Sequence, residues 1–460
     1  MRQFLNINRT PHWVRENQNN GPFFGQPEQV HLSMGGGLSE FVVTWITFDD
    51  ILFPTVELGD TPEDLKTIIK GKSSLFLDGS KNGKKRYVHR AVIVNIEPGK
   101  RYYYHVGSKY GWSPVFWLKG LKERPDGGYK FAVFGDMGNI NARSLGKLQS
   151  MAQQHEYDMV LHVGDFAYNM DTDDGKFGDE FFRQIEPIAA YIPYMVVPGN
   201  HESAYNFSHY KNRFTMPDTE DNLFYSFDIG AAHIIGFSTE VYFYTSYGWN
   251  QIANQWNWLV NDLHEANKKR HQRPFVITMG HRPMYCSTFD TDDCSRYQSI
   301  IRTGLPITHA YGLEKLFYEN QVDVELWAHE HTFERLYPVY NRTAYNKGTD
   351  PYYDPKAPVH FISGSAGCQE DTDTFISDPG PWSAFRSSDY GFSMMQVYNH
   401  THLRFQQISA AEDKIIDDVW VVKTHKNGYH RKGALNSLLN NGEHFDLNHK
   451  TQYQKDISDL

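Results

Sequence analysis

Cysteine is scarce in this sequence. Only Cys286, Cys294 and Cys368 occur in 460 residues. So few cysteines exclude a disulfide framework, and their spacing fits no zinc cluster. Cys286 and Cys294 enclose a short loop of Asp, Thr and Ser. They form either a local disulfide in an oxidising compartment or a pair of reduced thiols.

Long apolar runs and blocks of like charge are also absent. No stretch of eighteen apolar residues occurs, so the sequence predicts no membrane-spanning helix. The net charge is −10, and no charge block is long enough to indicate binding to nucleic acid or to an anionic membrane. The N-terminus lacks the apolar core of a signal peptide. The protein is therefore either cytosolic, or the sequence begins after, or without, an exporting segment.

The length of 460 residues indicates more than one domain. Residues 1–21 are polar and rich in asparagine, and we expect a loose arm there. Short alternating segments split by Gly, Pro and Asp turns follow, and they predict an all-β sandwich domain over residues 22–122. Strands alternate with helical segments over residues 127–424, which is typical of an α/β domain. Residues 425–460 form a polar tail.

Within the α/β domain, we expect helices in residues 142–155, 179–191 and 254–270. Its predicted strands begin with FAVF and MVLHV, and both of these runs stop on Gly-Asp. The further strands predicted in residues 356–424 are expected to complete a second sheet packed on the first.

Metal-competent side chains stand where the predicted strands end: Asp136, Asp165, Asn200, His281, His329 and His331. Because ligands bind at the carboxyl ends of strands in open α/β sheets, we expect all six on one edge of the sheet. Two carboxylates that converge without a nearby Lys or Arg need a cation. The alternative, ordinary turn and cap residues, is disfavoured because successive strand ends contain GDMG, GDFAY, GNHE, GHRPMY and AHEHTFE.

These residue types suit a pair of metal ions. Two ions about 3.5–4 Å apart can hold the attacking and the leaving oxygen of a phosphoryl displacement. A carboxylate between the ions would keep their spacing. The glycines before Asp165, Asn200 and His281 allow tight turns at the strand ends. In an extended segment, His329 and His331 would place both imidazoles on one side, where one could serve each ion.

The five motifs, in this order and spacing, resemble those of the calcineurin-like metallophosphoesterases, and within them the purple acid phosphatases of the large two-domain, animal-type form. The resemblance extends from about Gln26 to Lys423. It implies an α/β (α+β) sandwich of two mixed sheets flanked by helices, preceded by an all-β fibronectin-III-like sandwich. It also implies an acid phosphatase that hydrolyses phosphate monoesters with a metal-bound hydroxide at a dinuclear Fe(III)–M(II) centre.

The resemblance also implies the ligands. Those of Fe(III) would be Asp136, Tyr168 and His331, with Asp165 as the bridge, and those of a divalent zinc, iron or manganese ion would be Asn200, His281 and His329. Tyr168 selects the subfamily, because most metallophosphoesterases have a His where this chain has Gly138. A phenolate is a hard, anionic oxygen donor and favours a trivalent ion. The alternative is a strand-end tyrosine with its hydroxyl in water.

The proton donor is less clear from the sequence. His201 matches a substrate-facing histidine of the family that binds phosphate or protonates the leaving group. It could instead orient a carboxylate. Plant members have two histidines about nine residues after the position of His281, where this chain has TFDTDDCS. Asp290, Asp292 or Asp293 could replace them, or His201 could act alone.

The implied substrate is a phosphorylated small molecule or peptide, with no nucleic-acid partner and no membrane span. The family is mostly extracellular or lysosomal, and an exported protein could have N-glycans at Asn206, Asn341 and Asn399. Two other functions remain open. One is a metallophosphodiesterase or nucleotide pyrophosphatase with the same ligands, and the other is a catalytically silent relative whose β domain binds partners.

Overall fold

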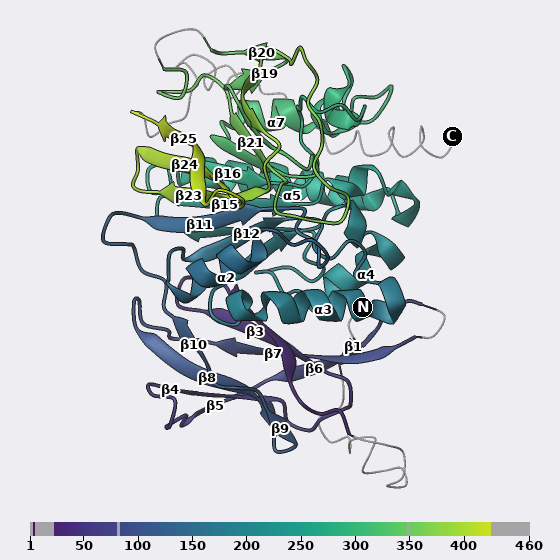
Figure 1. The fold of residues 1–460 in the computed structure, drawn as a ribbon, viewed down its shortest axis with the longest axis vertical. Helices are drawn as coiled ribbons and strands as arrows, with labels where there is room; N and C mark the ends of the chain where they lie inside the picture. The colour runs from purple at the N-terminus through teal and green to yellow at the C-terminus, as the bar shows by residue number, and fades with distance from the viewer. Residues whose placement is uncertain (1–2, 5–22, 81–82, 347–349, 425–460) are drawn as a thin grey trace.

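The computed structural model describes residues 3–4, 23–80, 83–346 and 350–424 (Figure 1). Apart from Gln3–Phe4, the predicted arm lies outside the described residues, and so does the predicted polar tail. In the described part of the chain, no helix is long and apolar enough to cross a membrane.

The N-terminal domain is a sandwich of two antiparallel sheets. The strand orders are β1-β6-β7-β3-β2 and β10-β8-β4-β5, with β9 paired to β8. The bounds are β1 Gln3–Phe4, β2 Glu28–Met34, β3 Phe41–Thr47, β4 Thr55–Gly59, β5 Thr67–Lys70, β6 Lys72–Leu77, β7 Lys85–Ile93, β8 Arg101–Ser108, β9 Gly111–Trp112 and β10 Phe116–Lys119. In β8, Tyr102, Tyr104 and Val106 are buried because alternate side chains of a strand face the same side.

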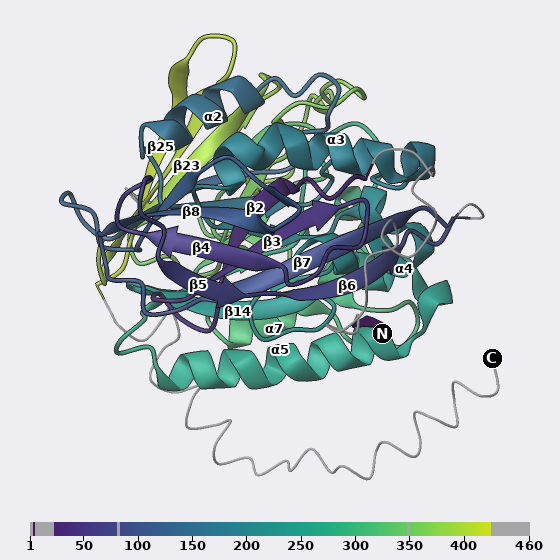
Figure 2. The same cartoon turned by 90° about the horizontal axis from the view of Figure 1, so that it is seen from below.

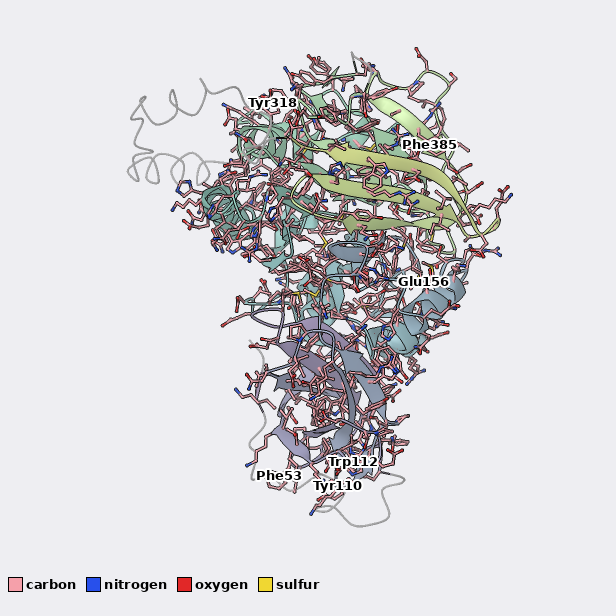
Figure 3. The ribbon with its side chains drawn as sticks, turned by 90° about the vertical axis from the view of Figure 1, so that its left-hand side faces the viewer. Phe53, Tyr110, Trp112, Glu156, Tyr318 and Phe385 are labelled. Atoms are coloured by element: carbon pink, nitrogen blue, oxygen red, sulfur yellow. A yellow bond between two sulfur atoms is a disulfide. The ribbon has the colours of Figure 1, made fainter. Side chains whose placement is uncertain are left out.

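The tyrosine-rich strand β8 also connects the sandwich to the second domain. The hydroxyl of Tyr104 donates a hydrogen bond of 2.5 Å to the carbonyl oxygen of Ala190. Phe53, Tyr110 and Trp112 lie at the far end of the sandwich (Figure 3), where the ring of Trp112 stacks on His105 with 4.2 Å between centroids. The ring of Trp112 therefore serves packing, whereas Phe53 is 59% exposed.

The second domain contains two mixed sheets, with helices around them (Figure 1). The first has the order β13-β12-β11-β23-β24-β25. Its strands are β11 Tyr129–Phe134, β12 Met159–Val163, β13 Tyr194–Val197, β23 Gly391–Val397, β24 His402–Ser409 and β25 Lys414–Val422. The second has the order β14-β15-β16-β17-β21-β18-β22. Its strands are β14 Phe224–Ile229, β15 Ala232–Phe237, β16 Phe275–Met279, β17 Val324–Trp327, β18 Phe333–Leu336, β21 Val359–Ser363 and β22 Ser383–Ser387.

The α-helices are α2 Leu145–Gln153, α3 Thr172–Ala189, α4 Ala204–Arg213, α5 Asn250–Lys268, α6 Ile300–Thr303 and α7 Leu313–Glu319, and β19 Val339–Tyr340 pairs with β20 Thr343–Ala344. Helices α2, α3 and α5 overlap the three segments where the sequence predicts helices, but α3 begins at Thr172 and α5 at Asn250, before the predicted starts. The architecture agrees with the predicted class of two mixed sheets with helices, preceded by an all-β sandwich.

The C-terminal strands differ from the prediction. Strand β21 lies in the second sheet, but β23, β24 and β25 extend the first, because β23 pairs antiparallel with β11. The prediction that these strands complete the second sheet is therefore wrong for three of them. Pairing with β23 gives hydrogen-bond partners to the edge of β11 that β12 does not cover.

A buried group of charged residues joins the two domains, and we call it the domain-interface cluster: Asp78, Arg86, Asp179, His209 and Arg213. The Nε and Nη2 atoms of Arg86 each donate to Asp179 at 2.8 Å. Arg213 donates from Nη1 to Asp179 at 2.8 Å and from Nε to Nδ1 of His209 at 3.2 Å. Asp78 lies 3.7 Å from Nη1 of Arg86. Figure 2 views the molecule from the sandwich side of this contact.

Candidate metal centre

The predicted ligands come from both sheets of the second domain. Asp136, Asp165 and Asn200 follow β11, β12 and β13, whereas His281 follows β16, and His329 and His331 follow β17. The prediction of one edge of one sheet is therefore wrong, since β11–β13 pair with one another and β16–β17 belong to the other sheet. The two sheets meet here, because the N–H of His329 donates to Oδ2 of Asp136 at 2.9 Å.

One part of the centre, which we call the Asn200 group, consists of Asp165, Asn200, His281 and His329. The Nε2 atom of His281 lies 3.1 Å from Oδ2 of Asp165, 3.2 Å from Oδ1 of Asn200 and 3.1 Å from Nδ1 of His329. The Nδ1–H of His281 donates to the carbonyl oxygen of Val163 at 2.8 Å. Because Nδ1 bears the proton of this bond, Nε2, which faces the other three donor atoms, is the nitrogen available to a metal ion.

The other part, the Tyr168 group, consists of Asp136, Tyr168 and His331. The Tyr168 hydroxyl lies 2.8 Å from Nε2 of His331 and 3.4 Å from Oδ1 of Asp136. The Nδ1–H of His331 donates to the carbonyl oxygen of Asp371 at 2.9 Å. The hydroxyl of Tyr168 thus faces two metal-competent side chains rather than water, and the side chain is buried.

Backbone geometry makes room for this arrangement. Gly164 has φ of +89°, and a Cβ there would lie 2.4 Å from Nδ1 of His281. A Cβ on Gly199 would lie 2.2 Å from Oδ1 of Asp165. His329 itself has φ of +72°, so the segment to His331 is not extended as predicted. The two imidazoles face different groups of the centre, which is compatible with one histidine for each ion.

Negative charge is in excess at the centre. Burial raises the pKa of Asp136 well above its ordinary value, and the charge of Asp165 adds to this effect. Burial likewise raises the pKa of Tyr168, with Asp136 and Asp165 contributing. Burial lowers the pKa of His281, but the charge and hydrogen bond of Asp165 together with the charges of Asp136 and Glu240 outweigh it and raise the value to about 10. Among the described residues, no Lys or Arg side chain forms an ion pair with Asp136 or Asp165.

This donor set fits metal ions. Two carboxylates, a phenol, an amide oxygen and three imidazoles point their donor atoms at one another at distances near 3 Å, as ligands of shared cations do. Oxygen and nitrogen donors of this kind suit ferric, zinc and manganese ions.

Glu202 supports the centre, and sequence reasoning missed it. The buried carboxylate accepts hydrogen bonds from the backbone N–H groups of Asp165 at 2.9 Å, Phe166 at 3.1 Å and Gly199 at 2.8 Å. Burial raises the pKa of Glu202 to about 8. The available signal was its place in the GNHE motif, directly after His201. Asp373, which accepts from the N–H of His331 at 2.6 Å, had no such signal.

The loop after His281 is closed by a disulfide between Cys286 and Cys294, one of the two alternatives left open by the sequence, while Cys368 is free and buried. The three aspartates of the loop after His281 make different contacts. Asp293 accepts from the hydroxyl of Ser299 at 2.6 Å and from the N–H of Ile300 at 2.9 Å, so it organises the chain locally. Asp290 is exposed.

Asp292 reaches the metal centre. Its carboxylate is hydrogen-bonded to Nε2 of His329 and accepts from Nη1 of Arg282 at 3.2 Å. Because Nδ1 of His329 faces the Asn200 group, Nε2 is the atom that bears the proton. A carboxylate behind a metal-binding imidazole fixes its tautomer and ring orientation.

His201 lies over the Tyr168 group. Its ring centroid is 4.3 Å from that of Tyr168, and Nδ1 lies 3.1 Å from Oδ1 of Asn169. Nε2 is 3.9 Å from Asp165 and 3.8 Å from Glu370. The side chain is 18% exposed, so a substrate can reach it.

Comparison with known proteins identifies the family. Three family models match: the N-terminal domain of purple acid phosphatases at residues 27–119, the calcineurin-like phosphoesterase at 129–333, and the C-terminal part of iron/zinc purple acid phosphatase-like proteins at 357–418. Acid phosphatase type 7 of Mus musculus is 49% identical over 403 residues, covering 86% of this chain and 91% of the relative. This chain belongs to the purple acid phosphatases.

A further relative and a solved structure are also similar to this chain. Phosphoenolpyruvate phosphatase of Allium cepa is 30% identical, covering 83% of this chain and 78% of the relative. The solved structure of purple acid phosphatase PPD1 from Lupinus luteus shares the fold, with a TM-score of 0.70 and 22% identity over 88% of this chain and 75% of that one. This chain is an acid phosphatase that hydrolyses phosphate monoesters at a dinuclear metal centre.

Proposed function

We propose that the two ions are Fe(III) and a divalent zinc, iron or manganese ion. In this proposal Asp136, Tyr168 and His331 bind Fe(III), Asp165 bridges, and Asn200, His281 and His329 bind the divalent ion. The observation that supports it most strongly is the buried Tyr168 hydroxyl, 2.8 Å from Nε2 of His331 and 3.4 Å from Asp136. A phenolate beside a carboxylate is a hard donor pair that a trivalent ion prefers.

When bound, the ions would generate a nucleophile from water and neutralise charge on the phosphoryl oxygens. The chain's own residues prepare the site for them. The carbonyl oxygens of Val163 and Asp371 accept hydrogen bonds from the Nδ1–H groups of His281 and His331. These bonds orient both rings so that their Nε2 atoms face the metal centre. Glu202 accepts a hydrogen bond from the backbone N–H of Asp165 and so fixes the backbone at that residue.

We assign the proton donor to His201. Its Nδ1 is held by the side chain of Asn169, which leaves Nε2 directed to the centre. Asp292 is occupied by His329 and Arg282, and Asp293 by the loop backbone, so neither is free to replace the missing histidine pair. His201 would bind the phosphoryl group or protonate the leaving oxygen.

The substrate class we propose is a phosphorylated small molecule or peptide, in an extracellular or lysosomal setting. The disulfide between Cys286 and Cys294 favours an oxidising compartment. Asn341 and Asn399 are exposed, as glycan sites need to be, whereas Asn206 is half-buried. We also propose domains at residues 22–122 and 127–424, separated by the loop between β10 and β11.

The visible spectrum of the purified protein, measured with its metal content, tests the proposed centre. A tyrosinate-to-ferric band should colour the protein purple or pink, and Tyr168→Phe should remove the band. Tyr194→Phe is the matched control, because Tyr194 is also buried and hydrogen-bonded to a histidine, His162, outside the centre. A colourless protein with both metals bound would refute the ferric assignment.

A further inference from the structure

Arg282, the residue after the predicted ligand His281, is held in one orientation by the groups around it. Its Nε lies 3.1 Å from both carboxylate oxygens of Glu240, which is fully buried. Its Nη1 donates to Asp292 at 3.2 Å, and its guanidinium lies over the ring of Phe243 at 4.4 Å. Two carboxylates and an aromatic face therefore fix the plane of this cation.

The guanidinium lies beside the Asn200 group. Its Nη1 is 2.9 Å from Nε2 of His329. In the described part of the chain, Nη2 of Arg282 has no hydrogen-bond partner, and it is not among the buried polar atoms that lack one. The side chain is 13% exposed, so this remaining donor edge is open to solvent.

We propose that Nη2 of Arg282 donates a hydrogen bond to a phosphoryl oxygen of the substrate. A guanidinium is always charged and suits phosphate oxygens better than an ammonium does. Because Glu240 and Asp292 fix its plane before substrate arrives, little side-chain freedom is lost on binding. Arg282 also offsets the charge of Asp292, which would otherwise repel an anionic ester. The proposal rests on the metal centre described above.

Inhibition by inorganic phosphate tests this role on the metal-loaded enzyme. In Arg282→Met, the inhibition constant for phosphate and KM for an aryl phosphate should both rise about 10- to 100-fold, the range expected for a lost charge-assisted hydrogen bond. Both metals should remain bound. Arg282→Lys should give a smaller rise, because it keeps the charge but not the fixed fork.

Two further variants complete the design. Arg296→Met is the matched control, because it removes an exposed positive charge four residues after Asp292. It should change the phosphate constant less than about twofold. Because Arg282→Met leaves Glu240 buried without its partner, the double variant Glu240→Gln/Arg282→Met provides a neutral replacement of the pair.

Three results would overturn the role of Arg282: an unchanged phosphate constant in both Arg282→Met backgrounds, an equal rise in Arg296→Met, or loss of metal that accounts for the whole effect. A wild-type protein without metals or phosphatase activity would instead contradict the proposed centre, so the two failures are distinguishable.

Discussion

The domain-interface cluster and the metal centre are two buried groups of charged residues, and they balance charge in different ways. In the cluster, Arg86 and Arg213 accompany Asp78 and Asp179, and each guanidinium donates directly to Asp179. In the metal centre, carboxylate oxygens, a hydroxyl and imidazole nitrogens face one another, with no Lys or Arg in an ion pair with Asp136 or Asp165 among the described residues.

This difference shows which feature identifies a metal site. The pKa is displaced in both groups, because burial lowers that of His209 to about 2 in the cluster and raises that of Asp136 in the centre. Displaced pKa values alone therefore do not distinguish a structural cluster of charged residues from a metal site. Pairing of charges does, since the carboxylates of the cluster are paired with the guanidinium groups of Arg86 and Arg213, whereas those of the centre need cations.

The largest effect is expected from Asp165→Asn, which removes one charge at nearly constant shape. Asp165 lies against His281 and accepts from the N–H of His201 at 3.0 Å. As the proposed bridge, its loss should weaken binding of both ions and lower kcat/KM by at least ~1,000-fold. Metal analysis and phosphatase assays measure both. Asp218→Asn, an exposed change in the same domain, should leave both unaltered.

The opposite result is expected at the interface. Arg86→Met deprives buried Asp179 of two hydrogen bonds and should lower the free energy of unfolding by about 3–5 kcal/mol, while the folded fraction keeps its metals. Denaturant unfolding measures the change. Lys85→Met removes the same charge from an exposed neighbouring position and should cost less than about 0.5 kcal/mol. Equal effects of the two substitutions would show that the cluster is not stabilising.

Acid should weaken the cluster as well. Burial, with Arg213 and Arg86 adding, lowers the pKa of His209 to about 2. Its folded value is thus below the unfolded value of about 6.5, so the stabilisation is present above pH 6.5 and is lost as the pH falls. Between pH 7 and pH 4 the loss should be about 3 kcal/mol.

Unfolding of the wild type and of His209→Gln from pH 7 to pH 4 checks this expectation. Gln can accept the bond from Arg213 but does not titrate, so its stability should fall less steeply with acid. Parallel curves for the two proteins would mean that His209 is not held neutral.

The motifs predict side chains that the structure brings together, whereas the surroundings of these side chains were predicted less well. Motifs at strand ends identify Asp136 and His281, because a residue that directly follows a buried parallel strand lies at the carboxyl end of the sheet, where ligands bind. Sheet membership could not be predicted, since nothing local pairs β23 with β11 across more than 250 residues. For the same reason the bonds between Arg86 and Asp179, 93 residues apart, had no sequence signal.

Local conformation was the other limit. The left-handed φ of His329 contradicts the extended segment that its i, i+2 spacing suggested. Among Asp290, Asp292 and Asp293, residue type gives no reason to choose, because all three have the same chemistry. The structure distinguishes them by contact, and only Asp292 reaches His329.

The smallest effect is expected from Asp292→Asn, and it would sharpen the distinction between the two parts of the centre. Loss of a carboxylate behind a metal-binding imidazole typically weakens metal affinity about 10- to 100-fold. Since His329 belongs to the Asn200 group, the divalent ion should be lost first on dialysis against chelator, while iron and the visible band remain. Asp290→Asn is the matched control on the same loop, as Asp290 is exposed and makes no bond to His329. Loss of iron before the divalent ion in Asp292→Asn would mean that His329 serves the other ion, and the assignment of the two parts would have to be exchanged.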